Sequence, residues 1–194
     1  MRQLWVFDFD GTITRCDSLL AFIRFACGSG RFVCGFLLYS PLLVLMKLRL
    51  YPNWKVKQKV FSYFFSGRTT EDFDALCRSF AEKRSSLIRP EAARKMAEGR
   101  RQGAQVVIVS ASIDNWVQPF FPSVTVLGTR IETAGGRLTG RFLTPNCYGE
   151  EKVNRLREVL AAPREEYYIV AFGDSRGDKE MLEYADEGYF RPFG

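Results

Sequence analysis

The sequence contains no histidine. This absence excludes mechanisms that need an imidazole base, including Ser-His-Asp hydrolysis, and zinc sites with histidine ligands. The cysteines are odd in number and never spaced C-x-x-C, so they indicate neither a zinc site nor a disulfide framework. We therefore expect reduced thiols and a cytoplasmic protein, because Met1-Arg2-Gln3 also leads straight into an apolar run without a signal peptide. The five cysteines are Cys16, Cys27, Cys34, Cys77 and Cys147.

The net charge of +6 is unevenly distributed over the 194 residues. The stretch from Arg15 to Arg89 holds 13 lysines and arginines against 5 acids, a balance of +8, and the rest of the chain is slightly acidic. A basic segment favours anionic partners, here a phosphorylated small molecule or an anionic membrane surface; nucleic acid is not expected. The alternative is a solvated, lysine-rich helical surface.

Buried strands alternate with helices in most of the chain, which predicts an α/β fold with a mostly parallel sheet. A hairpin is expected where Arg130–Thr133 and Arg137–Phe142 flank Ala134-Gly135-Gly136. The predicted strands are 4–7, 105–109, 124–127, 167–172 and 187–190, and the predicted helices between them are 90–102, 112–117, 150–160 and 178–184.

Residues 14–87 contain no convincing strand and predict an all-helical insertion after the first strand, with helices at 19–28, 54–65 and 70–86. Between these helices runs Phe32–Met46, which carries no charge and contains Ser40-Pro41. As a helix this run would span roughly 22 Å, short of the ~30 Å hydrocarbon core, so no transmembrane helix is expected. It predicts either two short buried helices broken at Pro41 or a hairpin whose apolar face meets a lipid or a partner.

Two carboxylates follow the first strand, at Asp8 and Asp10. Their i, i+2 spacing leaves both on one side of an extended backbone, at the sheet edge where open α/β folds keep their active sites. Two acids held so close repel each other, so the pair predicts a divalent cation, Mg²⁺ on oxygen ligands. Gly11 allows a tight turn and leaves its N–H free to face an anion.

Three further features lie at strand ends or at a helix start. Ser110-Ala111-Ser112 follows a buried strand and offers hydroxyls and N–H groups to an anion. Asp174 and Asp178 lie in a glycine-containing loop after another strand. Lys152 lies in the first turn of a helix, where the helix dipole disfavours a cation, so it needs another partner. This set suits phosphoryl transfer.

The order D-x-D-G-T, strand-Ser, Lys, G-D-S-x-x-D resembles the haloacid dehalogenase superfamily. The resemblance covers nearly the whole chain and is to the phosphatases whose helical cap is inserted after the first strand, a subgroup that includes phosphoserine phosphatase. It implies a Rossmann-like three-layer core formed by residues 1–13 and 88–194, and a helical cap domain formed by residues 14–87.

The resemblance also implies roles for particular residues. Asp8 would be the nucleophile that forms an aspartyl-phosphate, and Asp10 would be the general acid and base. The implied phosphate-binding residues are Gly11, Ser110, Ala111 and Lys152, and the implied Mg²⁺ ligands are Asp8, Asp10, Asp174 and Asp178.

Some residues keep two interpretations. Asp17 lies where phosphoserine phosphatases carry a cap glutamate that recognises the substrate amine, but Asp17 also suits a helix N-cap, and Ser112 and Ser175 are expected to be N-caps. Gly177 departs from the asparagine of the family pattern.

Gly177 and the uncharged run Phe32–Met46 both depart from phosphoserine phosphatase, so the identity of the substrate stays open. It is expected to be a small phosphorylated metabolite or, alternatively, a phosphorylated lipid such as phosphatidylglycerophosphate or a lysolipid phosphate, with the enzyme then peripheral to the membrane. A non-catalytic binding or scaffold protein with the same fold is a further alternative.

Overall fold

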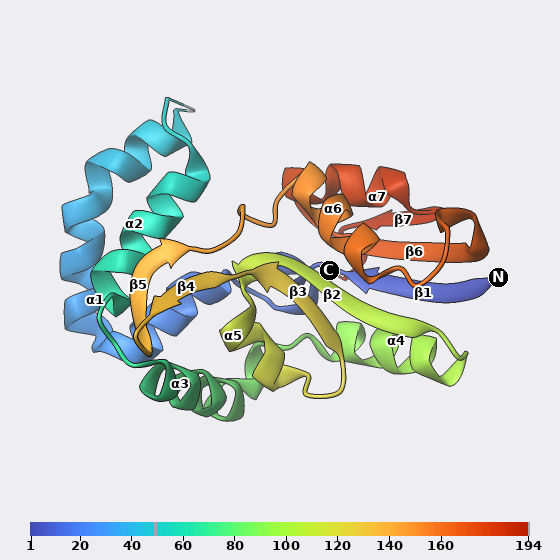
Figure 1. Ribbon diagram of the computed structural model, residues 1–194, viewed down its shortest axis with the longest axis horizontal. Coiled ribbons are helices and arrows are strands. Elements are labelled where there is room, and N and C mark those ends of the chain that lie inside the picture. The colour runs from blue at the N-terminus through green and yellow to red at the C-terminus, as the bar shows by residue number, and fades with distance from the viewer. Residues whose placement is uncertain (49, 194) are drawn as a thin grey trace.

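A parallel five-stranded sheet, in the order β3-β2-β1-β6-β7, forms the centre of the computed structural model (Figure 1). The structure describes residues 1–48 and 50–193, so Arg49, a basic residue just after the apolar run, lies outside the described residues. The predicted α/β class is confirmed. The strands are β1 (Arg2–Phe7), β2 (Gln105–Ile113), β3 (Thr125–Thr129), β6 (Tyr167–Gly173) and β7 (Glu187–Phe190).

Helices cover both faces of this sheet, which gives the predicted three layers. The alternation of strand side chains explains why, because Trp5 and Phe7 pack on the side of α4 while Leu4 and Val6 pack on the side of α6 and α7. All four side chains are buried. The helices are α4 (Pro90–Arg101), α6 (Glu150–Val159) and α7 (Lys179–Tyr184), and a four-residue helix, α5 (Asp114–Val117), follows β2.

The predicted helical insertion consists of α1 (Ser18–Lys47), α2 (Asn53–Phe65) and α3 (Thr70–Lys83). The two chain connections to the sheet run antiparallel, since Arg15 N donates to Leu87 O at 3.1 Å and Arg89 N donates to Ile13 O at 2.8 Å. The two connections lie side by side at the predicted boundaries of the insertion, residues 14 and 87. The division into two domains itself stays a prediction.

The predicted hairpin is formed by β4 (Ile131–Ala134) and β5 (Arg137–Phe142). It lies beside the insertion, because Gly67 N donates to Leu138 O at 2.8 Å and Leu138 N donates to Arg68 O at 2.9 Å. A segment from the second half of the chain therefore supports α2 (Figure 1).

The prediction of two short buried helices broken at Pro41 is wrong. Ser18–Lys47 consists of two helical segments joined by a kink at Gly28, where φ is 77° and ψ is 163°, so the predicted end of the helix over 19–28 is confirmed and the second segment runs on past Pro41. Pro41 has no N–H to donate to the carbonyl of Leu37, four residues earlier. The Ser40 hydroxyl donates to that carbonyl instead, at 2.8 Å, so the helix continues past the proline.

One face of α1 packs against α2 and the opposite face is exposed. Gly35 is buried so closely against Phe64 that a Cβ there would overlap the phenylalanine ring. By length and composition, α1 is the one helix within residues 1–48 and 50–193 that could cross a membrane, and 6% of its most apolar window is buried. We call the large exposed side chains in the part of α1 after Gly28 the apolar strip: Val33, Leu37, Leu38, Val44, Leu45 and, just beyond the helix, Leu48.

Candidate active site

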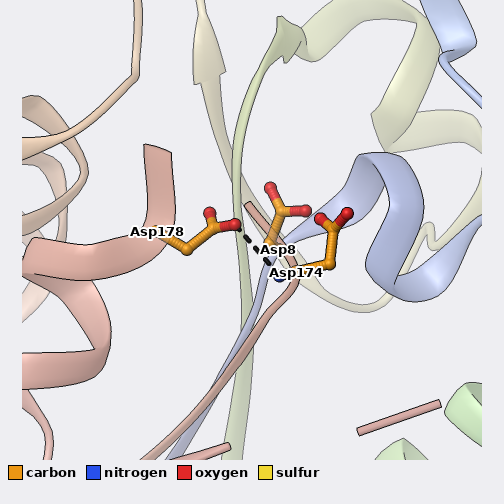
Figure 2. A group of neighbouring side chains, drawn as sticks. All are labelled: Asp8, Asp174 and Asp178. Carbon is orange, nitrogen blue, oxygen red and sulfur yellow. Dashed lines mark hydrogen bonds between the residues drawn. The ribbon is translucent and has the colours of Figure 1, made fainter. Parts of the chain in front are cut away.

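Three carboxylates meet at the carboxyl edge of the sheet (Figure 2). Asp8 follows β1 and Asp174 follows β6; these strands are neighbours, and Asp8 N donates to Phe172 O at 2.8 Å. Asp178 reaches the same place from the turn before α7. One oxygen from each carboxylate lies within 4.8 Å of the other two. The structure therefore brings together three of the predicted site residues from both ends of the chain.

Lys152 supplies the positive charge beside these acids. Its side chain is 2% exposed, and its Nζ donates to Asp8 Oδ1 at 2.5 Å, to Asp178 Oδ1 at 2.5 Å and to Val109 O at 3.0 Å. Burial alone would lower the pKa of Lys152, but the charges of Asp8 and Asp178 outweigh it and raise the pKa above its ordinary value. The ammonium is therefore charged. Asp8 and Asp178 are the partners expected for a cation at the start of α6, where the helix dipole disfavours it.

The two carboxylates that Lys152 contacts differ in their acidity. Burial raises the pKa of Asp8 to about 7, although the charge of Lys152 acts in the opposite direction. For Asp178 burial also acts upward, but Lys152 and hydrogen bonds from Ser175 lower the pKa below its ordinary value. Asp178 Oδ2 accepts from Ser175 N at 2.9 Å, Ser175 Oγ at 2.9 Å and Asp174 N at 3.1 Å. Asp178 thus holds both Lys152 and the loop, and Ser175 is the predicted cap.

Gly11 allows the loops after β1 and β6 to approach each other. Its φ is 81°, and a Cβ on it would overlap the carboxylate of Asp174. The next residue, Thr12, donates from its hydroxyl to Asp174 Oδ1 at 3.3 Å. Burial, and then the nearby Asp178, raise the pKa of Asp174. The nearby acids therefore help to raise the pKa of both Asp8 and Asp174.

Asp10 lies next to this cluster in a separate hydrogen-bond environment. Its Oδ1 accepts from Ser18 N at 2.8 Å, and its Oδ2 accepts from the hydroxyl of Ser112. Burial and the charge of Asp17 raise the pKa of Asp10. The expectation that Ser112 is a helix N-cap is wrong, because β2 continues past the predicted end at residue 109 through Ile113, and Ile113 takes the capping position of α5.

The remaining predicted residues lie around this centre. Ser110 is buried, and its hydroxyl accepts from Ser112 N at 3.0 Å, while Ala111 is partly buried beside it. Asp17 is exposed and caps α1, since its Oδ1 accepts from Leu20 N at 3.2 Å. Its contact with a substrate stays a prediction, as do the phosphate contacts of Ser110 and Ala111.

Sequence reasoning missed two features of the site. Trp116 donates from its indole N–H to Ser18 Oγ at 3.1 Å, a contact between residues that lie far apart in the sequence. The glycine at position 177 is explained by packing, because a Cβ there would overlap the ring of Tyr148. No local pattern indicates either contact. An asparagine at position 177 would require the ring of this tyrosine to move.

The donor set suits a hard divalent cation. The side chains are all carboxylates, the oxygen ligands that Mg²⁺ prefers, and the Lys152 ammonium pairs with two of them, Asp8 and Asp178. Because burial raises the pKa of Asp8 and of Asp174, a second positive charge would favour their ionised forms.

The fold and this cluster define a class of hydrolases with an α/β fold and with carboxylates grouped at the carboxyl edge of a parallel sheet. Residues 5–183 match the haloacid dehalogenase-like hydrolase family, and the chain belongs to that family. The family and the enzyme class predicted from the motifs are confirmed.

Individual relatives are similar over nearly the whole of this chain. The chain is 37% identical to Protein CicA of Caulobacter vibrioides over 195 residues, which cover 98% of this chain and 86% of that protein. It resembles a solved structure of a protein of unknown function from Bordetella pertussis Tohama I, with a TM-score of 0.82 and 20% identity over 94% of this chain and 86% of that one. A phospho-aspartyl intermediate analogue of phosphoserine phosphatase gives a TM-score of 0.57 and 19% identity over 95% and 83% of the two chains.

Proposed function

We propose that the protein is a Mg²⁺-dependent phosphatase that hydrolyses a small phosphomonoester through an aspartyl-phosphate on Asp8. The observation that supports this most directly is the Asp8 carboxylate, which is held through Oδ1 by the buried ammonium of Lys152 within a cluster of acids. A phosphoserine phosphatase of the same fold has been solved as an analogue of a phospho-aspartyl intermediate. The enzyme is proposed to be cytoplasmic, consistent with its five free cysteines.

In the first step, a carboxylate oxygen of Asp8 attacks phosphorus, the ester P–O bond breaks, and Asp10 gives a proton to the departing alcohol. In the second step, Asp10 takes a proton from a water molecule that attacks phosphorus, and phosphate leaves with the Asp8 carboxylate restored. Lys152, Ser110 and the N–H groups near Gly11 and Ala111 hold the phosphate oxygens.

The carboxylates of Asp8 and Asp174 and the backbone carbonyl of Asp10 would hold Mg²⁺, with Asp178 beside them. Bound there, the cation neutralises phosphate charge. Both oxygens of Asp178 already accept hydrogen bonds, so its main contribution is to orient Lys152 and the loop that carries Asp174.

The proposed function is tested by a phosphate-release screen across amino-acid, sugar, nucleotide and lysolipid phosphates and p-nitrophenyl phosphate. We expect release from one class of ester that needs Mg²⁺ and is lost in EDTA. A panel without any Mg²⁺-dependent release, measured on folded protein, would contradict the proposal.

A second candidate substrate is a phosphorylated lipid, and the exposed apolar strip on α1 favours it. Leu37 is 68% exposed and Leu38 is 62% exposed. At the α1–α2 turn, Trp54 is 44% exposed with the Lys55 ammonium 5.5 Å from its ring centre. Apolar side chains with neighbouring cations suit the surface of an anionic bilayer, where an interfacial helix buries its apolar face.

For the lipid candidate we expect the full chain to co-sediment with phosphatidylglycerol vesicles at low salt, and to bind less to phosphatidylcholine vesicles. Leu37→Gln combined with Leu38→Gln should abolish binding, because polar groups cannot enter the bilayer without cost. The matched control is Leu143→Gln, which changes a leucine that is 63% exposed outside the insertion. Equal binding of all variants, or none by the parent protein, would exclude the lipid candidate.

A further inference from the structure

A chain of buried hydrogen bonds ends on the carboxylate of Asp10. The indole N–H of Trp116 donates to Ser18 Oγ at 3.1 Å, Ser18 Oγ lies 2.9 Å from Ser112 Oγ, and Ser112 Oγ donates to Asp10 Oδ2. Trp116, Ser18 and Ser112 are 1%, 0% and 4% exposed, so water does not compete for these groups.

The chemistry of the end groups fixes the direction of the chain. An indole N–H can only donate, and the ionised form of Asp10, the form that takes a proton from water in the second step, can only accept. The Ser18 hydroxyl therefore receives from Trp116 and donates to Ser112, and the Ser112 hydroxyl donates to Asp10. Hydrogen bonds aligned in this way polarise one another, which strengthens the last bond.

The two oxygens of Asp10 are fixed from two sides. Oδ1 accepts from the backbone N–H of Ser18 at 2.8 Å, at the start of α1, and Oδ2 accepts from Ser112 on β2. The Trp116 ring stacks on Phe22 of α1, with centroids 4.9 Å apart and planes at 25°. The carboxylate is thus oriented jointly by the insertion and by the sheet.

We propose that Ser112 is a positioning residue which, with Ser18 and Trp116, holds Asp10 in the orientation that proton transfer to the leaving group needs. The inference rests on the proposed function, because it assigns Asp10 the proton. In this proposal Asp10 alone among these hydrogen-bonded residues exchanges a proton with the substrate, and the others act through it. Without Ser112 the carboxyl group of Asp10 stays in place but can rotate about its side-chain bonds, so proton transfer to the leaving group should slow more than attack on phosphorus does.

The test compares esters that differ in their need for a proton. A simple alkyl phosphate needs the leaving alcohol protonated, whereas p-nitrophenolate leaves without a proton. For Ser112→Ala we expect kcat/KM for the alkyl ester to fall about 10- to 100-fold, part of the 10²- to 10⁴-fold that general acid catalysis typically supplies. The value for p-nitrophenyl phosphate should change less than about threefold, and Ser112→Thr should restore the alkyl ester.

Trp116→Phe keeps an aromatic ring against Phe22 and removes the donor, so it should show a smaller loss with the same selectivity. The matched control is Phe22→Leu, which disturbs the packing of Trp116 and removes no hydrogen bond. The midpoint of thermal unfolding is measured for every variant.

Equal losses for both esters in Ser112→Ala, or the same selectivity in Phe22→Leu at a similar midpoint, would overturn the positioning role while the phosphatase activity stands. If the parent protein hydrolyses neither ester nor any compound of the panel, the proposed function fails, and this inference fails with it.

Discussion

Asparagine in place of Asp8 is expected to reduce Mg²⁺-dependent phosphate release to background, a loss on the order of 10⁴-fold or more. The amide has the shape of the carboxylate but lacks the nucleophilic oxygen that attacks phosphorus. The fold should survive, because Lys152 keeps its 2.5 Å contact with Asp178 and its bond to Val109 O. The readout is phosphate release at saturating substrate, with circular dichroism to show that the variant is folded.

A covalent trap distinguishes loss of the nucleophile from loss of substrate binding. When the parent enzyme is denatured in acid during turnover, the peptide that contains Asp8 should carry an added phosphoryl group, and the variant should carry none. Asp72→Asn is the matched control, since Asp72 is an exposed acid in the first turn of α3 and should leave turnover unchanged. Turnover retained by Asp8→Asn would indicate direct attack by water.

The fold and the carboxylate cluster were predictable because they depend on local patterns. A buried apolar run followed by an acid marks the end of a parallel strand, and such ends meet at one edge of a sheet. The position of Lys152 was predictable from its conflict with the helix dipole beside several acids. The structure shows the partners that this reasoning called for, Asp8 and Asp178.

The predictions that failed depend on contacts between residues far apart in the sequence, or on a hydrogen bond within one helical turn that replaces a missing one. Ser112 resembles an N-cap in sequence, but the partner of its hydroxyl, Asp10, is brought close by the pairing of β1 with β2. Pro41 resembles a helix break, but the hydroxyl of Ser40 replaces the hydrogen bond that the proline cannot make. Hydrophobic periodicity indicates neither the contact of Ser112 with Asp10 nor the hydrogen bond of the Ser40 hydroxyl.

Sequence reasoning left open whether the Phe32–Met46 run is buried or presents an apolar face to a lipid or a partner. A run without charges usually marks core, and here one face does pack on α2. Which positions face outward depends on the pairing of α1 with α2, and Leu37 and Leu38 fall on the side away from it.

Methionine in place of Lys152 is expected to impair both catalysis and stability. Methionine fills a similar buried volume without an ammonium, so Asp8 and Asp178 would face each other uncompensated and Val109 O would lose its donor. Removing one partner of a buried ion pair typically costs about 3–5 kcal/mol in the free energy of unfolding. Loss of the positive charge at the phosphate should lower kcat by about 10²- to 10³-fold, as for other groups that stabilise developing negative charge.

The destabilisation of Lys152→Met should increase with pH when it is measured in EDTA. Burial raises the pKa of Asp8 to about 7 even with the ammonium present, and removing that ammonium raises it further. A carboxyl group with a raised pKa binds its proton more tightly in the folded state, so its stabilising contribution is lost as pH rises through the folded pKa. Urea unfolding at about pH 6 and about pH 8 should therefore give a larger difference from the parent protein at the higher pH.

Lys179→Met is the matched control for this prediction, because Lys179 follows Asp178 directly, its side chain is 61% exposed, and its contact with Glu183 is 3.6 Å long. That variant should stay within about 0.5 kcal/mol of the parent protein and keep its activity. The double variant Asp8→Asn with Lys152→Met adds a further check, since neutralising Asp8 removes the repulsion that the lost ammonium leaves behind. It should be more stable than Lys152→Met alone, and a double variant that is less stable would show that Asp8 and Lys152 do not balance each other's charge.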